Sequence, residues 1–214
     1  MRAMNSDETT AYWDQRHRRF SPLSSGGVVG IDAGANEIFY AMRLGRLLDL
    51  VGDVSESRAP LRVLDAGCGK GWFARAMARF GHRVDGIDIS QAAIEECRAQ
   101  AADQDEYAVS ALADWHPPYM YDVVYSVDVL FHVMDDDAWA DSVRNLASLV
   151  RLGGRLILSD HGAEADHTWS TYQRTRGLSR YRALVQPLGY GSDQFRSYGF
   201  RNTPVGFIVF DRVS

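Results

Sequence analysis

From residue 61 onward, apolar runs of strand length alternate with segments whose apolar residues recur at helical spacing. Strands are expected at 61–65, 83–88, 107–109, 121–127 and 155–159. Between the first two, Phe73, Met77 and Phe80 stand at i, i+4 and i+7, which predicts a helix over 71–80. Strands that alternate with helices in this way are typical of a parallel sheet covered on both faces. We therefore predict an α/β fold of the doubly wound class.

Capping residues mark where further helices begin. Ser90 is expected to be the N-cap of a helix that buries Ile94 and Cys97. Three aspartates at 135–137 predict the start of another helix, because the helix dipole favours carboxylates there. We expect the glycine pair at 153–154 to stop that helix and introduce the strand at 155–159.

Further elements are expected before residue 61 and after the strand at 155–159. A late helix around Tyr181 and Val185 is expected to end early, at Pro187. Two strands are expected to follow, at 194–198 and 205–210, and they are close enough in sequence to pair antiparallel. Before residue 61, helices are expected at 9–19 and 34–51, joined by a glycine- and serine-rich loop at 21–30. The chain thus divides into a helical segment, 1–60, and a core, 61–214.

Composition narrows the class of protein. The chain has 214 residues and 46% apolar content, which suits one domain with a sizeable core. With 23 basic and 28 acidic side chains, a broad basic surface for nucleic acid is not expected. No run approaches the roughly 18 apolar residues of a membrane span, and the polar N-terminus resembles no signal peptide. Cys68 and Cys97 lack metal-ligand spacing and fit a reducing compartment, so we expect a cytoplasmic protein without a membrane partner.

The most informative stretch is 63–71, where Gly67, Gly69 and Gly71 alternate between a strand and a helix. Glycine allows a sharp turn and leaves no Cβ where a ligand lies against the main chain. A strand, a glycine turn and a helix N-terminus together form a nucleotide pocket. The dinucleotide pattern G-x-G-x-x-G, begun at Gly67, would need its third glycine at Trp72. The spacing therefore points to a different nucleotide.

The pattern Asp-x-Gly-x-Gly-x-Gly, which begins at Asp65, resembles motif I of the class I S-adenosylmethionine (SAM)-dependent methyltransferases. A second anchor is Asp88, 21 positions beyond Gly67 at the end of the second strand, where a carboxylate can accept hydrogen bonds from ribose hydroxyls. The resemblance implies SAM as the cofactor and a Rossmann-like, seven-stranded, mostly parallel sheet with the last strand inserted antiparallel. It also implies that Ile89 borders the adenine, that Asp65 lies beside the methionine end, and that residues 1–60 cover the cofactor mouth.

Ligands of open α/β sheets bind outside the carboxyl ends of the strands. After the third strand, Asp114 fits the family position that meets the adenine amino group, and Trp115 would flank the ring. Asp114 as the cap of a turn before two prolines is the alternative. The expected cofactor-binding residues are Asp65, Gly67, Cys68, Gly69, Asp88, Ile89, Asp114, Trp115 and Ser126.

Methyl transfer requires a positioned acceptor and a route for its proton. A hydroxyl acceptor benefits from a general base, and histidine suits that role near neutral pH. The catalytic candidates are His132, after the fourth strand, and His161, after the fifth, with His167 also plausible. The segment 128–133 resembles a small-molecule branch of the family, in which many relatives carry a structural histidine. A structural role for His132 is therefore the alternative.

The remaining histidines, His17, His82 and His116, are not expected near the acceptor. Asp128 and Asp160 could join the candidate histidines at a divalent metal, but their spacing matches no metal motif, and we expect no metal.

We predict methyl transfer from SAM to a hydroxyl of a small molecule, such as a sugar or a biosynthetic intermediate. Transfer to nitrogen or carbon, and a non-catalytic protein that binds SAM or S-adenosylhomocysteine, are the alternatives.

Overall fold

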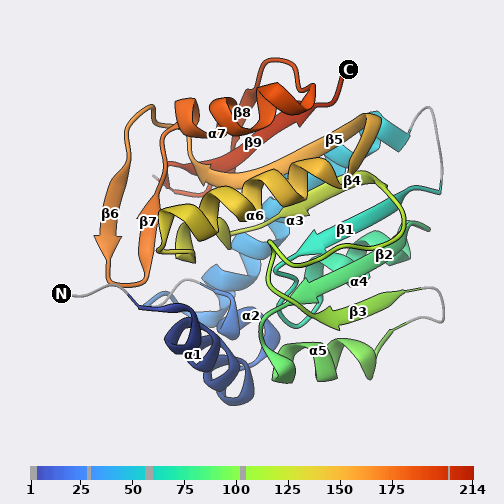
Figure 1. The fold of residues 1–214 in the computed structure, drawn as a ribbon. Helices are drawn as coiled ribbons and strands as arrows, with labels where there is room; N and C mark the ends of the chain where they lie inside the picture. The colour runs from blue at the N-terminus through green and yellow to red at the C-terminus, as the bar shows by residue number, and fades with distance from the viewer. Residues whose placement is uncertain (1–3, 28–29, 56–59, 102–104, 202) are drawn as a thin grey trace.

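The computed structural model describes residues 4–27, 30–55, 60–101, 105–201 and 203–214. A seven-stranded sheet with the order β3–β2–β1–β4–β5–β9–β8 forms its centre (Figure 1). Its strands are β1 Arg62–Ala66, β2 Arg83–Asp88, β3 Glu106–Val109, β4 Tyr121–Ser126, β5 Val150–His161, β8 Gln194–Ser197 and β9 Val205–Asp211. The first five run parallel, and β9 lies antiparallel between β5 and β8. The predicted α/β class and the order implied by motif I are confirmed.

Helices cover both faces of this sheet (Figure 1). One face packs against α3 (Ala33–Ser55), α4 (Trp72–Arg79) and α5 (Gln91–Arg98), and the other against α6 (Asp136–Ser148) and α7 (Leu178–Val185). The apolar stripes predicted from helical spacing are the faces that these helices bury, except at Phe80. The prediction for Phe80 was wrong: α4 ends at Arg79, and the Phe80 side chain is 64% exposed. Two apolar cores result, one on each side of the sheet.

The helix ends follow the capping signals. The Ser90 side chain accepts a hydrogen bond from the Ala93 amide, and Asp135 accepts one from the Ala138 amide at 2.8 Å. At the other end of the chain, α7 gives way to a 3₁₀ turn, Gln186–Leu188, which contains Pro187. These boundaries confirm the sequence predictions.

The prediction for the glycine pair at 153–154 was wrong. The helix α6 ends at Ser148 and β5 already begins at Val150, so both glycines lie inside the strand. Gly153 has a φ of +73°, and the β4–β5 register shifts between Tyr121 and Val123. The pair therefore forms an irregularity in a long strand, where glycine tolerates the left-handed backbone.

Two elements lie beside the carboxyl ends of the parallel strands. The N-terminal part contains α1 (Ser6–Arg19) and a short helix, α2 (Pro22–Ser25), within the predicted loop, of which residues 28 and 29 lie outside the described residues. A hairpin of β6 (His167–Ser170) and β7 (Gln173–Thr175) follows β5 and was not predicted. The Met4 amide donates to the Thr171 carbonyl at 3.2 Å, so the chain beside α1 touches the hairpin turn (Figure 1).

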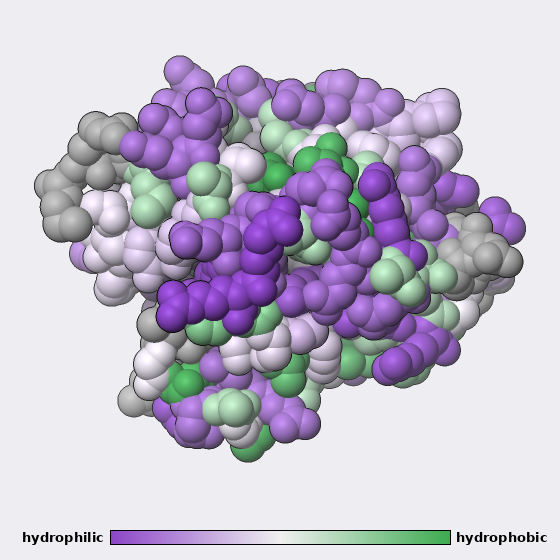
Figure 2. All heavy atoms as spheres, turned by 90° about the horizontal axis from the view of Figure 1, so that it is seen from below, coloured by the Kyte–Doolittle hydropathy of each residue, from purple (hydrophilic) through white to green (hydrophobic). Residues whose placement is uncertain are grey.

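The surface on the side of α1 and α5 is mostly hydrophilic, and its hydrophobic residues are scattered in small groups (Figure 2). No helix in the described part of the chain is long and apolar enough to span a lipid bilayer. The apolar residues are gathered instead in the two cores that flank the sheet.

Candidate active site

The glycine turn follows β1 directly and is anchored on β2. The amides of Gly67 and Cys68 donate to the Ile87 carbonyl at 2.7 and 2.9 Å. Gly67 has a φ of +83°, and a Cβ there would lie 2.3 Å from the Val129 side chain. A residue with a side chain would thus be strained and would clash, which explains the glycine at this position.

Asp88 joins the glycine turn to the start of α5. Its carboxylate accepts hydrogen bonds from the amides of Gly69 and Ser90, each at 2.9 Å. Burial raises the pKa of this carboxyl above its usual value. Two donors hold the carboxylate in one orientation, and each oxygen retains a further lone pair for another donor.

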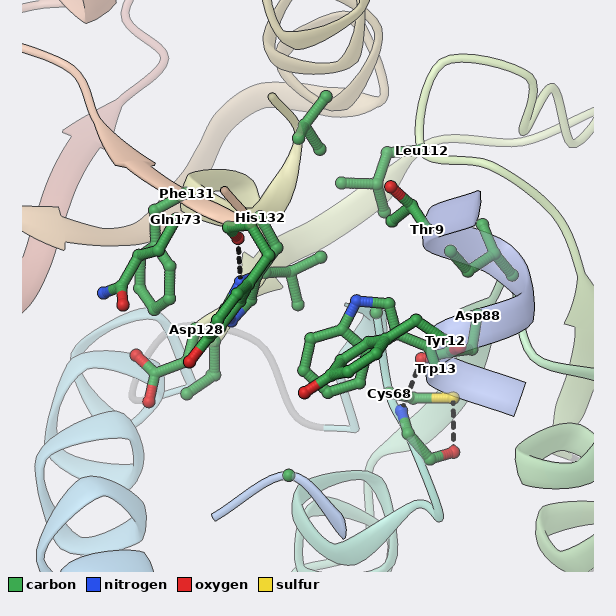
Figure 3. A pocket seen from close by; sticks show the side chains of 18 of the residues that line it. Thr9, Tyr12, Trp13, Cys68, Asp88, Leu112, Asp128, Phe131, His132 and Gln173 are labelled. Carbon is green, nitrogen blue, oxygen red and sulfur yellow. Dashed lines mark hydrogen bonds between the residues drawn. The ribbon is translucent and has the colours of Figure 1, made fainter. Parts of the chain in front are cut away.

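A cavity of about 1320 Å³ opens along the carboxyl ends of the strands. In the view of Figure 3, Cys68 and Asp88 lie on one side, His132 on the other, and Tyr12 and Trp13 of α1 stand between them. Six of the expected cofactor-binding residues line it: Gly67, Cys68, Gly69, Asp88, Ile89 and Asp114.

The other three lie outside the cavity lining. Asp65 and Ser126 are buried in β1 and β4, each with 1% of its surface exposed. The Trp115 indole donates to the Tyr121 hydroxyl at 3.0 Å. The structure therefore brings the glycine turn, Asp88, Ile89 and Asp114 together at the cavity. Asp65, Trp115 and Ser126 do not line it.

His132 lines the cavity at the far side from Asp88 (Figure 3). Its Nδ1 lies 2.7 Å from the Tyr172 carbonyl oxygen, at the turn of the β6–β7 hairpin. The Tyr172 ring is stacked at 5.7 Å between centroids, and the Trp13 ring meets His132 edge-on at 4.9 Å. Burial lowers the pKa of His132 below its usual value, so the neutral imidazole is favoured.

His161, the second candidate, also lines the cavity, at the end of β5. Its ring lies 5.0 Å from that of Trp169, between centroids, and burial lowers its pKa. His167 is exposed on β6 and also packs against Trp169, with 4.0 Å between ring centroids, and it lies outside the cavity lining. The structure thus places His132 and His161 in the same cavity.

Asp128 takes part in a buried network that the sequence did not indicate. Its carboxylate pairs with Arg43 of α3 and accepts a hydrogen bond from the Tyr198 hydroxyl at 2.8 Å. Its amide donates to the Ser159 hydroxyl, and its φ is +57°, which is uncommon for a residue with a side chain. This network fixes the backbone that leads to His132.

The Asp160 carboxylate is also engaged in hydrogen bonds within the protein. It is fully buried and accepts hydrogen bonds from the Tyr181 hydroxyl at 2.6 Å and the Arg176 amide at 3.1 Å. Burial raises its pKa to about 6. Across the described ranges, no cluster of three or more histidine, cysteine or acidic side chains is arranged to hold a metal ion.

His17 is a cavity residue that the sequence analysis did not place. It lies on α1, is 4% exposed, and its ring lies against Gly69. Like Arg43, it comes from a helix far along the chain from the glycine motif. Only the folding of the N-terminal segment over the strand ends brings it there.

Comparison with known proteins was made by sequence and by fold. A family model described as a methyltransferase domain matches residues 36–203. Ubiquinone biosynthesis O-methyltransferase of Alkalilimnicola ehrlichii is 39% identical over 104 residues, covering 46% of this chain and 40% of the relative. The enzyme of that name from Ralstonia nicotianae is 40% identical over 116 residues, 50% of this chain and 47% of the relative. The chain spans about half the length of the curated relatives it matches.

Solved structures resemble the whole chain. Magnesium protoporphyrin IX methyltransferase from Synechocystis, crystallised with SAM, has a TM-score of 0.72 and 22% identity, covering 99% of this chain and 100% of that one. The N-methyltransferase NodS from Bradyrhizobium japonicum, with S-adenosylhomocysteine, has a TM-score of 0.70 and 16% identity, covering 96% and 99%. At these identities the likeness shows the fold. Because the family model covers most of the chain, the protein belongs to the methyltransferase-domain family, within the class I SAM-dependent methyltransferases.

Proposed function

We propose that the protein methylates a hydroxyl group of a small molecule with SAM as the methyl donor, and that His132 is the general base. Family membership and the printed activity of the curated relatives, O-methylation, support the reaction class. The observation that carries the proposal is the 2.7 Å contact between Nδ1 of His132 and the carbonyl oxygen of Tyr172. Solved structures of the same fold include an N-methyltransferase, so the acceptor atom has to be argued from the site.

The residues on one side of the cavity fit a nucleoside cofactor. Gly67 and Gly69 present backbone without side chains, and the Asp88 carboxylate has lone pairs left for hydroxyl donors. Ile89 and Leu112 supply apolar surface there, and Asp114 supplies a carboxylate for an amino group. When bound, SAM supplies an electrophilic methyl group on a sulfonium centre.

We assign residues 1–60 as a cap over the cofactor mouth, in front of a core of residues 61–214. The support is that α1 contributes Thr9, Tyr12, Trp13 and His17 to the cavity lining. A cap that excludes water strengthens electrostatic interactions in the site and holds the acceptor in place.

The hydrogen bond at His132 decides which ring nitrogen can take a proton. A carbonyl oxygen only accepts, so Nδ1 must carry hydrogen in its 2.7 Å contact with Tyr172. In the neutral ring, Nε2 therefore holds the free lone pair. Because burial lowers the pKa of His132, this basic form is populated at neutral pH. As the ring is clamped by Trp13 and Tyr172, it can accept a proton from a hydroxyl without reorienting.

The Asp128 carboxylate also lines the cavity, but it is not the proposed base. The Asp128 carboxylate is already engaged by Arg43 and Tyr198. Its role in the proposal is to hold the strand-to-helix backbone in position. The acceptor would lie between His132 and the aromatic wall that includes Phe131 and Trp169.

A two-step experiment tests the proposal. The protein is first incubated with SAM labelled in its methyl group and a small-molecule extract, and mass spectrometry identifies the labelled product. With that acceptor, we expect His132→Ala to lower kcat by about 10²–10⁴-fold while S-adenosylhomocysteine binding stays within a few-fold. His161→Ala, which alters the second candidate base in the cavity, is the matched control and should change kcat much less. The rate should fall as pH drops through the lowered pKa of His132 and protonates Nε2.

Two results would contradict this assignment. If His132→Ala lowered the melting temperature and cofactor affinity together, the histidine would be structural. If neither variant changed kcat and the labelled product carried the methyl group on nitrogen, the acceptor would be an amine that needs no protein base.

A further inference from the structure

We propose that His17 of α1 is a cofactor-binding residue that contacts the sugar hydroxyls of the nucleoside together with Asp88. The inference rests on the proposed use of SAM and assigns to it a residue outside the glycine motif. Its basis is the position of the ring beside Gly69 and Asp88, and the attachment of α1 to the core.

The ring of His17 lies where the nucleoside side of the site is built. A Cβ added to Gly69 would lie 3.3 Å from Cε1 and 3.8 Å from Nε2 of His17, so the ring faces the second glycine of the turn. The Asp88 carboxylate, which binds the Gly69 amide, attracts the imidazole electrostatically. All three residues line the cavity.

Nε2 is the nitrogen of this ring that a ligand in the cavity can reach. His17 is 4% exposed, and its Nδ1 is closed off from the cavity, with no hydrogen-bond partner among the described residues. Nε2 is the ring nitrogen nearer to Gly69. Burial lowers the pKa of His17, and a neutral ring offers one donor and one acceptor. A sugar hydroxyl, which both donates and accepts, matches Nε2 in either tautomer.

The helix that carries His17 is attached to the cofactor side of the core. Asp14, one turn earlier, accepts hydrogen bonds from the Ser90 hydroxyl at 3.0 Å and the Ala92 amide at 2.8 Å. Arg16 donates to the backbone carbonyls of Ser24 and Ser25. These contacts hold α1 against α5 and the chain after α1, so the imidazole is positioned before a ligand arrives.

The same helix reaches the other end of the cavity. Tyr12 stacks on Tyr172 at 5.9 Å between centroids, and Trp13 packs against His132. A ligand that contacts His17 therefore acts on an element that also contacts the proposed base.

Calorimetric titration with S-adenosylhomocysteine tests the inference without any acceptor. We expect His17→Leu, which keeps bulk but removes both nitrogens, to weaken binding about tenfold, or about 1.4 kcal/mol. His17→Gln, whose longer side chain places an amide near the position of Nε2, should stay within about threefold of the wild type. The matched control is His82→Leu, because His82 is also buried but lies outside the cavity lining and should leave affinity unchanged. Thermal unfolding without ligand checks that each variant is folded.

The outcomes separate the inference from the function on which it rests. Unchanged affinity in His17→Leu would overturn it, and so would tighter binding, which would mean that the ring occupies nucleoside space. An equal loss in the Leu and Gln variants would overturn it too, because ring packing rather than a hydrogen bond would then matter. If the wild type failed to bind S-adenosylhomocysteine, the proposed function itself would fail.

Discussion

Asp65 shows, at the scale of a single residue, how burial changes what a motif residue can do. It begins the Asp-x-Gly-x-Gly-x-Gly pattern, yet it lies inside β1 with 1% exposure, outside the cavity lining. Burial raises its pKa to about 7. The sequence identified the residue type and the spacing, but the degree of burial depends on α4 and the neighbouring strands. Asp65 is thus held under the turn rather than presented to the cavity.

This raised pKa makes stability depend on pH in a defined direction. The folded carboxyl keeps its proton up to about pH 7, while the unfolded one loses it near 3.8. Between these values the unfolded state binds fewer protons, so stability falls as pH rises, by about 4 kcal/mol in total. We expect Asp65→Asn to remove this slope, as measured by urea unfolding at several pH values between about 4.5 and 6.5. Identical slopes in wild type and variant would contradict the burial argument.

At the scale of elements, helices and strands were predicted correctly where they bury an apolar face. The helices and strands of the core were predicted because their buried faces impose a regular apolar spacing, and caps such as Ser90 mark their ends. The hairpin β6–β7 was missed because only one of its strand residues, Thr175, is buried, and so it carries no such spacing. Gly153 and Gly154 were misread because glycine serves helix ends and strand irregularities equally well.

The helix α1 gives a prediction at this scale. Asp14→Ala removes the acceptor for Ser90 and Ala92, so α1 should detach more often from α5. Hydrogen exchange in 6–19 should then become faster, while the strands of the sheet keep their protection. Arg18→Ala is the matched control, because Arg18 pairs with Asp14 at the exposed surface and such pairs contribute little. Equal exchange in both variants would show that these hydrogen bonds do not hold the helix.

At the scale of the whole molecule, the two halves of the cavity differ in how far apart in the sequence their residues lie. The cofactor half is set by the glycine turn and by Asp88, which are close in sequence, and its motif could be recognised without a structure. The other half joins Arg43, Asp128 and Tyr198, which are separated by 85 and 70 positions. No single-sequence pattern encodes such contacts, because they arise from the order of the strands. Hence motif I and most of the fold were predictable, whereas His17 and the Asp128 network were not.

The central claim is that this cavity binds SAM, and calorimetry tests it most directly. Titration of the wild type with SAM, S-adenosylhomocysteine and NAD should give one-site binding for the first two and none for NAD. Asp88→Ala should weaken binding of the first two by about 1.5–3 kcal/mol, the range for charge-assisted hydrogen bonds, while the protein stays folded. Binding of NAD without binding of SAM would contradict the account, and SAM affinity unchanged in Asp88→Ala would contradict its placement of the ribose.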